Sequence, residues 1–94
     1  MFYKVLYSKK ALKSLKKMDN HNKLYILSWI TKNLEGTDNP YEKGKTLKGN
    51  FKGSIRYRIG DYRVIVDIRD NELIILVIDI DHRKDIYLWK DIIL

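Results

Sequence analysis

The strongest constraint on the fold is an alternating run of apolar and basic residues that ends at a two-residue turn. Residues 55–59 alternate with a period of two, which indicates a β-strand with one apolar face and one basic face. Gly60 and Asp61 follow, and a glycine at the first central position favours a type II′ hairpin turn. Residues 62–68 then form the return strand. The chain therefore contains an antiparallel hairpin that can bury one of its faces.

Two further strands are predicted on either side of this hairpin in the chain. Residues 2–7 are rich in aromatic and β-branched side chains, which is typical of a short strand. Residues 73–80 form an apolar strand after a turn at residues 70–71. Residues 37–53 include the single proline and are predicted to form a loop. Residues 84–94 fit either a short last helix or an irregular extension.

Helical spacing of apolar residues marks the segment between the first strand and the loop. Ser8 is a candidate N-cap for a first helix, and Gly36 is a suitable residue to end a second helix. The apolar stripes are Ala11, Leu12, Leu15 and Met18 in the first helix and Leu24, Leu27, Ile30 (or Ile26) and Leu34 in the second. The sequence thus predicts an α+β fold of order β-α-α-β-β-β, with an N-terminal helical hairpin packed on a mainly antiparallel four-stranded sheet.

Length and composition exclude several classes of protein. The 94 residues are expected to form one domain, residues 1–94, because a second core would not fit. The absence of cysteine excludes disulfide scaffolds, and with only two histidines neither a metal nor a cofactor is expected. Apolar runs are far shorter than the roughly 20 residues that span a bilayer, so a cytoplasmic protein without membrane contact is expected. The net charge of +7 indicates a polyanionic or an acidic partner.

A group of arginines is predicted to gather on the sheet. Arg56 and Arg58 share one face of their strand, because side chains two residues apart point the same way. That face must lie away from the helices, since two buried and unpaired guanidinium groups would be strongly destabilising. The return strand brings Arg63 close by. The segment after the last strand adds Arg83, with His82 and Tyr87 at the edge of the cluster.

Such a cluster suits phosphate chemistry. Guanidinium groups stay charged and bind phosphate in a bidentate fork, so several of them can stabilise the additional negative charge of a pentacoordinate transition state. The pattern predicts a metal-independent ribonuclease in which the 2′-hydroxyl of the RNA attacks the adjacent phosphate. Asp79 and Asp81 alternate along the last strand and are candidates to pair with the arginines. The alternative is that an exposed sheet face simply carries charges.

Three motifs together resemble the RelE toxins of bacterial toxin–antitoxin systems. They are Leu47-Lys48-Gly49, the run RYRIGDYRVI over residues 56–65, and HRKDIY over residues 82–87. The resemblance implies the fold predicted above and a ribosome-dependent endonuclease that cuts mRNA in the ribosomal A site. It implies a 2′,3′-cyclic phosphate product and neutralisation by a RelB-type antitoxin. It also implies contact with operator DNA only through the toxin–antitoxin complex.

The resemblance assigns roles to single residues. Arg56 and Arg58 match the paired basic positions of the family, Arg63 matches the arginine of its YR motif, and Arg83 matches the basic residue after the last strand. Tyr87 matches the C-terminal tyrosine that orients or activates the nucleophile.

The general base is left open by this comparison. Arginine stays protonated near neutrality and is a poor base. A related branch, the YoeB toxins, has a carboxylate at the position of Lys45, and its histidine near the C-terminus is placed differently from His82. The candidates are Tyr87, which is the first choice, and His82, Lys48 and Lys52.

Lysines form a second basic surface. The first helix carries them on the side opposite its apolar stripe, where they either contact ribosomal RNA phosphates or form a solvated face. The candidate RNA-binding residues are Lys9, Lys10, Lys13, Lys16, Lys17, Lys48 and Lys52. Two other functions fit the same sequence: a toxin like the ParE proteins, which share the fold and poison DNA gyrase, and a non-catalytic basic binding module.

Overall fold

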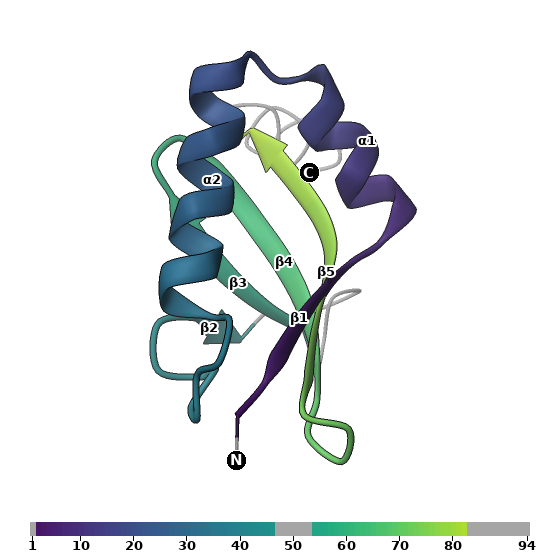
Figure 1. Ribbon diagram of the computed structural model, residues 1–94, viewed down its shortest axis with the longest axis vertical. Helices are drawn as coiled ribbons and strands as arrows, with labels where there is room; N and C mark the ends of the chain where they lie inside the picture. Colours follow the sequence, from purple (N-terminus) through teal and green to yellow (C-terminus); the bar gives the residue numbers. More distant parts are fainter. Residues whose placement is uncertain (1, 47–53, 83–94) are drawn as a thin grey trace, which may run out of the picture.

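The computed structural model describes residues 2–46 and 54–82, in which two helices lie on one face of a sheet (Figure 1). The helices begin where polar side chains cap them. The Ser8 hydroxyl accepts a hydrogen bond from the Ala11 N–H at 3.0 Å, and the Asp19 carboxylate accepts one from the Asn22 N–H at 3.4 Å. In chain order the elements are β1 (Lys4–Tyr7), α1 (Lys9–Lys17), α2 (Asn20–Asn33), β2 (Lys45–Thr46), β3 (Ser54–Ile59), β4 (Tyr62–Arg69) and β5 (Ile74–His82).

The sheet has the strand order β1-β5-β4-β3-β2. Only the β1–β5 pair is parallel among the described strands, so the prediction of a mainly antiparallel sheet with a helical hairpin on one face is confirmed. The four predicted strands are present, and the two-residue β2 is an addition, because it lies in the segment predicted to be a loop. No helix among residues 2–46 and 54–82 is long and apolar enough to span a membrane.

The core lies between the helices and the sheet. Ile26 and Ile30 of α2 and the C-cap residue Leu34 are buried at a spacing of four, and they pack with Tyr57 and Val66 of the sheet. The predicted stripe of α2 is therefore correct for Ile26 and wrong for Leu24, whose side chain is 61% exposed. Four-residue spacing from Ile30 reaches Ile26, and Leu24 falls on another face of the helix.

The two hairpin turns differ from each other. Gly60 has a φ of 58°, and it is the one residue of the Gly60-Asp61 turn in the left-handed region, as expected for type II′. The second turn is longer than predicted, because it occupies residues 70–73 and Leu73 adopts a φ of 55°. Strand β4 therefore extends to Arg69, and β5 begins at Ile74.

A register shift in β5 sets which side chains face the helices. Val66 lies opposite Val77, but the preceding residue Ile65 lies opposite Asp79, so Ile78 is an additional residue in β5. Side-chain alternation reverses at this point. Ile80 is consequently buried on the helix side, together with Val77.

Candidate functional site

Three of the predicted arginines lie together on the sheet face away from the helices. Tyr57, Ile59 and Val64 are buried on the helix side, so the residues that alternate with them point to the other side. The β3–β4 register pairs Arg58 directly with Arg63. We call Arg56, Arg58 and Arg63 the arginine face.

Other charged residues extend the arginine face across the sheet. Arg56 lies opposite Lys45 of β2 on one side and opposite Ile65 of β4 on the other. Arg63 lies opposite Asp81 of β5. Cross-strand neighbours have Cβ atoms about 4.5–5.5 Å apart, so two or more of these basic groups can reach a single phosphate.

The Arg56 side chain carries a hydrogen-bond donor with no partner among the described residues. Its Nε atom is buried and makes no hydrogen bond within residues 2–46 and 54–82. A buried donor left unsatisfied costs about 1–3 kcal/mol, and more when the group is charged.

Asp79 pairs with Lys10, and no ion pair joins it to an arginine within residues 2–46 and 54–82. Its Oδ2 atom lies 3.2 Å from the Lys10 Nζ atom, and its Oδ1 atom accepts the Ile80 N–H at 2.9 Å. Asp79 is only 8% exposed, so Lys10 neutralises a nearly buried carboxylate next to the arginine face. Lys10, one of the predicted RNA-binding lysines, is thus engaged in an intramolecular ion pair.

His82 lies on the other side of the sheet from the arginines. It pairs with Tyr62 in the β4–β5 register, and the two rings meet edge to face with centroids 5.1 Å apart. Both rings line a hollow on the helix side together with Lys17 and Asp19. The structure thus places His82 on the sheet face opposite Arg56, Arg58 and Arg63, because the shift at Ile78 reverses the alternation.

The structure leaves several predicted site residues undescribed. Those residues are Arg83, Tyr87, Lys48 and Lys52, together with the segment 84–94. The remaining lysines of the first helix lie on its exposed side, whereas Ala11 and Leu15 are buried beneath it. These exposed lysines are Lys9, Lys13, Lys16 and Lys17.

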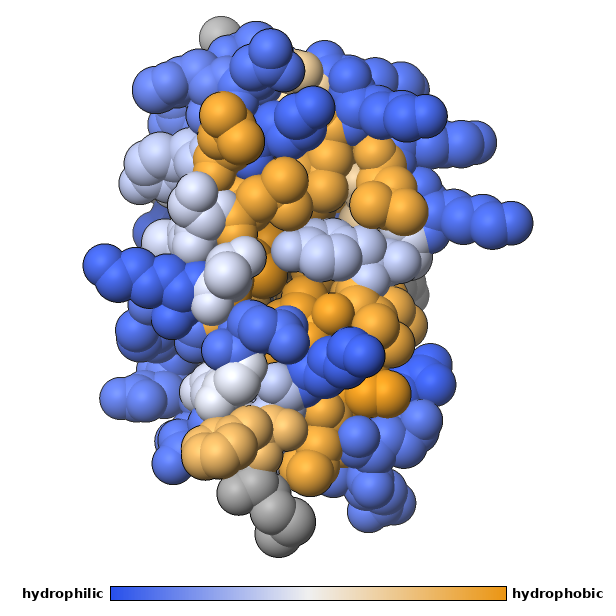
Figure 2. Space-filling model, in the orientation of Figure 1, coloured by the Kyte–Doolittle hydropathy of each residue, from blue (hydrophilic) through white to orange (hydrophobic). Residues whose placement is uncertain are grey.

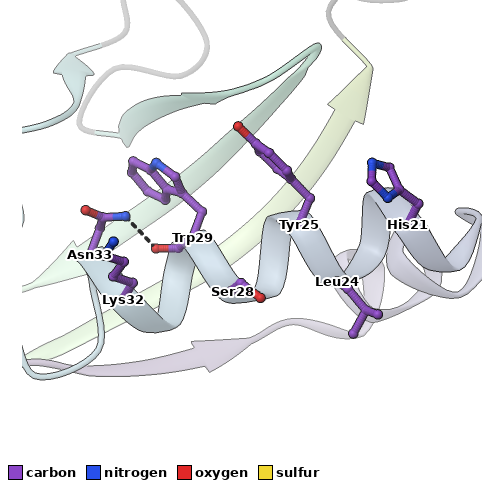
Figure 3. Close-up of a pocket in the computed structure, with 7 residues that line it drawn as sticks. All are labelled: His21, Leu24, Tyr25, Ser28, Trp29, Lys32 and Asn33. Carbon is purple, nitrogen blue, oxygen red and sulfur yellow. Dashed lines mark hydrogen bonds between the residues drawn. The ribbon is translucent and has the colours of Figure 1, made fainter.

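An outer hollow along α2 was not predicted from the sequence. Figure 3 shows the rings of Tyr25 and Trp29 pointing to the same side of α2, with Leu24 turned away from them. Trp29 also packs against Tyr57 with ring centroids 5.8 Å apart, and its backbone carbonyl accepts a hydrogen bond from Asn33 at 2.9 Å. The four-residue spacing of Tyr25 and Trp29 was the only signal in the sequence for this surface.

Tyrosines fix the segment that leads to β2. Tyr3 and Tyr41 donate hydrogen bonds to the two oxygens of Asp70, at 2.7 and 2.8 Å. These bonds lower the pKa of the Asp70 carboxyl. Burial and the bond to Asp70 raise the pKa of Tyr41 to about 12. Tyr57 donates to the Pro40 carbonyl, and burial raises the pKa of Tyr57 to about 12.

Comparison with known proteins defines the class. The family model described as the ParE toxin of the type II toxin–antitoxin system parDE matches residues 5–87. Toxin RelG of Mycobacterium tuberculosis is 35% identical over 48 residues, which are 51% of this chain and 55% of RelG. The chain thus aligns with about half the length of this curated relative.

Solved structures agree in fold. The RelBE2 toxin–antitoxin complex of Mycobacterium tuberculosis contains a chain that superposes with a TM-score of 0.80 at 24% identity, covering 88% of this chain and 93% of that one. The archaeal RelE–RelB complex of Pyrococcus horikoshii gives a TM-score of 0.63 at 25% identity, covering 88% and 97%. The RelB–RelE complex of Methanococcus jannaschii gives a TM-score of 0.59 at 27% identity, and the match covers 89% of this chain and 96% of that chain.

The fold and these matches are those of toxins from type II toxin–antitoxin systems. Within that class, the chain belongs to the ParE toxin family of the RelE/ParE superfamily.

Proposed function

We propose that the protein is a ribosome-dependent endoribonuclease that cuts mRNA in the ribosomal A site and so inhibits translation. The observation that carries this proposal is the arginine face, in which Arg58 lies opposite Arg63 and Arg56 lies opposite Lys45. Three permanent cations on one face of the sheet, with Arg58 exposed and Arg56 and Arg63 half-buried, suit a phosphodiester backbone. No metal is needed for this chemistry, because the attacking group belongs to the RNA.

The proposed reaction is an internal transfer at phosphorus. The 2′-oxygen forms a bond to the adjacent phosphorus, its proton passes to a base, and the bond from phosphorus to the 5′-oxygen breaks as that oxygen gains a proton. The products are a 2′,3′-cyclic phosphate and a 5′-hydroxyl. Negative charge increases in the pentacoordinate transition state, and Arg56, Arg58, Arg63 and Arg83 are proposed to stabilise it.

The proton acceptor is proposed to be Tyr87. A tyrosine needs a lowered pKa to act as a base, and neighbouring arginines would supply it. Lys48 and Lys52 are the alternative acceptors. His82, whose ring packs on Tyr62 on the helix side, is a weaker candidate in that position.

Docking on the ribosome is proposed to use the exposed lysines of α1. Each phosphate neutralised by a lysine releases counterions, so binding should weaken steeply with salt. Lys10 is expected to contribute least, because it is paired with Asp79. The remaining lysines are Lys9, Lys13, Lys16 and Lys17, with Lys48 and Lys52 as further candidates.

A RelB-type antitoxin is proposed to neutralise the toxin in the cytoplasm. Several structures with the same fold are complexes of RelE or RelE-like chains with RelB partners. Contact with operator DNA is proposed to occur only through the toxin–antitoxin complex.

Cell-free translation of a defined mRNA tests the nuclease proposal. New 5′ ends are mapped after adding the protein, with and without ribosomes. Cuts within codons that require ribosomes, and that are lost in Arg58→Ala and Arg63→Ala, are the expected result. Arg69→Ala is the matched control, because Arg69 lies at the other end of β4 and pairs with Asp67 at 3.5 Å. Intact mRNA with the wild-type protein would contradict the proposal.

Inhibition of DNA gyrase is the second candidate function, and the match to the ParE family model favours it. Purified gyrase would then lose supercoiling activity in the presence of the protein, and induced cells would show a DNA-damage response with whole mRNA. A third outcome, harmless overproduction without a partner, would indicate a non-catalytic binding module.

A further inference from the structure

Three aromatic side chains form a row along the outer side of α2. His21, Tyr25 and Trp29 are four residues apart, so they share one face of the helix and follow each other at intervals of about 6 Å. Figure 3 shows all three rings on the same side of α2. They line a hollow of about 600 Å³. We call this row of three rings the aromatic ladder.

The hollow at the aromatic ladder differs in chemistry from the surface between the two helices. Figure 2 views the molecule from the helix side and shows hydrophobic side chains gathered between α1 and α2. The outer hollow is aromatic and polar instead, because Ser28, Lys32 and Asn33 complete its lining. Leu24, its one aliphatic lining residue, is turned away from the rings (Figure 3). An aliphatic partner surface would therefore leave the polar groups of this hollow unpaired.

Two rings of the aromatic ladder are held by the fold and still present surface to solvent. Trp29 is half-buried and packs on Tyr57, with ring centroids 5.8 Å apart. Tyr25 is 53% exposed, and its ring lies over the β3–β4 turn, where a Cβ atom at Gly60 would be 3.8 Å from the Tyr25 Cε1 atom. A ring that is already ordered loses little conformational entropy when a flat group stacks on it. Such rings suit the faces of unpaired nucleic-acid bases.

Positive charge lies at the C-terminal end of the aromatic ladder. Lys32 lines the hollow, and the Lys43 Nζ atom donates a hydrogen bond to the Asn33 Oδ1 atom at 2.5 Å. No carboxylate is found among the described residues that line the hollow. A second copy of this chain, with a net charge of +7, would be repelled. Single-stranded nucleic acid fits this surface, since its phosphates pair with ammonium groups while its bases stack on rings.

We propose that the aromatic ladder binds bases of the mRNA strand next to the phosphate that is cut. The inference deepens the proposed function, and the choice of mRNA rests on that function. The β3–β4 turn joins the two surfaces. Arg58 and Arg63 each lie two residues from the Gly60-Asp61 turn, on the sheet face away from the helices, and the Tyr25 ring covers the same turn from the helix side. A strand that passes around the end of this hairpin contacts both surfaces.

An oligonucleotide that cannot be cut tests the aromatic ladder without ribosomes. The probe is a 2′-O-methyl oligoadenylate of about ten nucleotides, which lacks the attacking 2′-hydroxyl, so binding is measured apart from cleavage. A second oligonucleotide has the same number of phosphates and no bases. Binding to the full-length chain is followed by fluorescence anisotropy. Quenching of Trp29 is followed in a Trp89→Phe background, because the chain has two tryptophans.

The oligoadenylate is expected to bind one to one, at least tenfold more tightly than the oligonucleotide without bases, and to quench Trp29. Tyr25→Leu should weaken its binding at least fivefold, because a base loses its stacking partner, whereas Tyr25→Phe should bind like wild type. Arg63→Ala should weaken the binding of both oligonucleotides. Phe2→Leu is the matched control, since it makes the same change at a 69% exposed ring outside α2 and should have no effect. Circular dichroism confirms that each variant is folded.

Equal affinity for the two oligonucleotides, or wild-type affinity in Tyr25→Leu, would overturn the aromatic ladder as a site for bases. Two oligonucleotides bound per protein would overturn the assignment to one mRNA strand, because the hollow would then hold a separate RNA. One-to-one binding with the expected losses, in a protein that leaves mRNA intact on ribosomes, would sustain the aromatic ladder as a site for single-stranded RNA and reject only the nuclease proposal.

Discussion

Arg58 of β3 lies directly opposite Arg63 of β4, so two permanent positive charges face each other across one rung of the sheet. Like charges in directly opposed positions destabilise a sheet. The hairpin keeps this unfavourable pair on the face where a phosphate is proposed to bind. Asp81 lies opposite Arg63 on its other side, so the repulsion bears chiefly on Arg58.

Removing one of these arginines is expected to stabilise the fold while it reduces function. Arg58→Ala relieves the repulsion, and we expect the free energy of unfolding to rise by about 0.2–1 kcal/mol. RNA affinity and mRNA cleavage should fall in the same variant. Urea unfolding and cleavage assays measure the two effects. The control Arg69→Ala should neither raise the free energy of unfolding nor reduce mRNA cleavage. A lower free energy of unfolding in Arg58→Ala would contradict the proposed repulsion between Arg58 and Arg63.

The pair between Lys10 and Asp79 is expected to stabilise the packing of α1 on β5. Lys10→Met keeps the aliphatic stem and removes the charge, which leaves a nearly buried carboxylate without its ammonium partner. We expect a loss of about 1–2 kcal/mol in the free energy of unfolding. Lys9→Met is the control and should have almost no effect on urea unfolding. Equal losses in both variants would mean that the ion pair contributes nothing specific.

The Asp70 carboxylate is expected to make stability depend on pH in the acid range. Its pKa is lowered in the folded state from the ordinary value of 3.8, chiefly by hydrogen bonds from Tyr3 and Tyr41. The folded state therefore binds fewer protons, and its stabilisation is full above that value and lost as the pH falls through the lowered pKa. Asp70→Asn should flatten the acid limb of stability against pH. Tyr25→Phe is the control, and an unchanged acid limb in Asp70→Asn would refute the link.

Gly44 is expected to tolerate no larger side chain. A Cβ atom there would lie 2.3 Å from the Ile55 Cγ2 atom and 2.9 Å from the Tyr57 Cε1 atom, and both neighbours are buried. Gly44→Ala should therefore lower the free energy of unfolding by about 1–3 kcal/mol. Thermal unfolding measures this loss.

A substitution at Gly36 serves as the comparison for Gly44→Ala, because it tests backbone strain without a steric clash. Gly36 has a φ of 78° and open space around it, so Gly36→Ala should cost only the backbone strain of about 1–2 kcal/mol. Gly36→Asn should recover part of this loss, because asparagine tolerates the left-handed region. Asparagine at residue 44 should give no recovery, since the clash there is steric.

Local patterns predicted the hairpin and its arginines well. The period of two over residues 55–59 and the Gly60-Asp61 turn are properties of neighbouring residues, and they were enough to orient Arg56 and Arg58. The position of Arg63 followed from the short turn. Side-chain alternation and turn geometry are local, so a single sequence carries them.

The placement of His82 could not be predicted in the same way. The apolar run before it contains no residue that marks Ile78 as the extra one, because isoleucine suits a regular strand and an irregular one equally. An unbroken strand that buries Ile75 and Val77 would have turned His82 toward the arginines. The register shift depends on how β5 packs on β4 and α1, which is a property of the whole fold. The exposure of Leu24 has a similar origin. The packing of α2 on the sheet determines that the face with Ile26, and not the face with Leu24, is buried.

The parallel pairing of β1 with β5 has a consequence for the order in which the protein is made. On its own ribosome the chain emerges from β1 onward, and β1 finds its neighbour only after β5 has been synthesised. Strand β5 also separates β1 from the hairpin that carries the arginines. The sheet therefore closes late, through contacts between segments about 70 residues apart. This protein is proposed to attack translating ribosomes. It thus completes its fold only after most of its chain has left the ribosome that synthesises it.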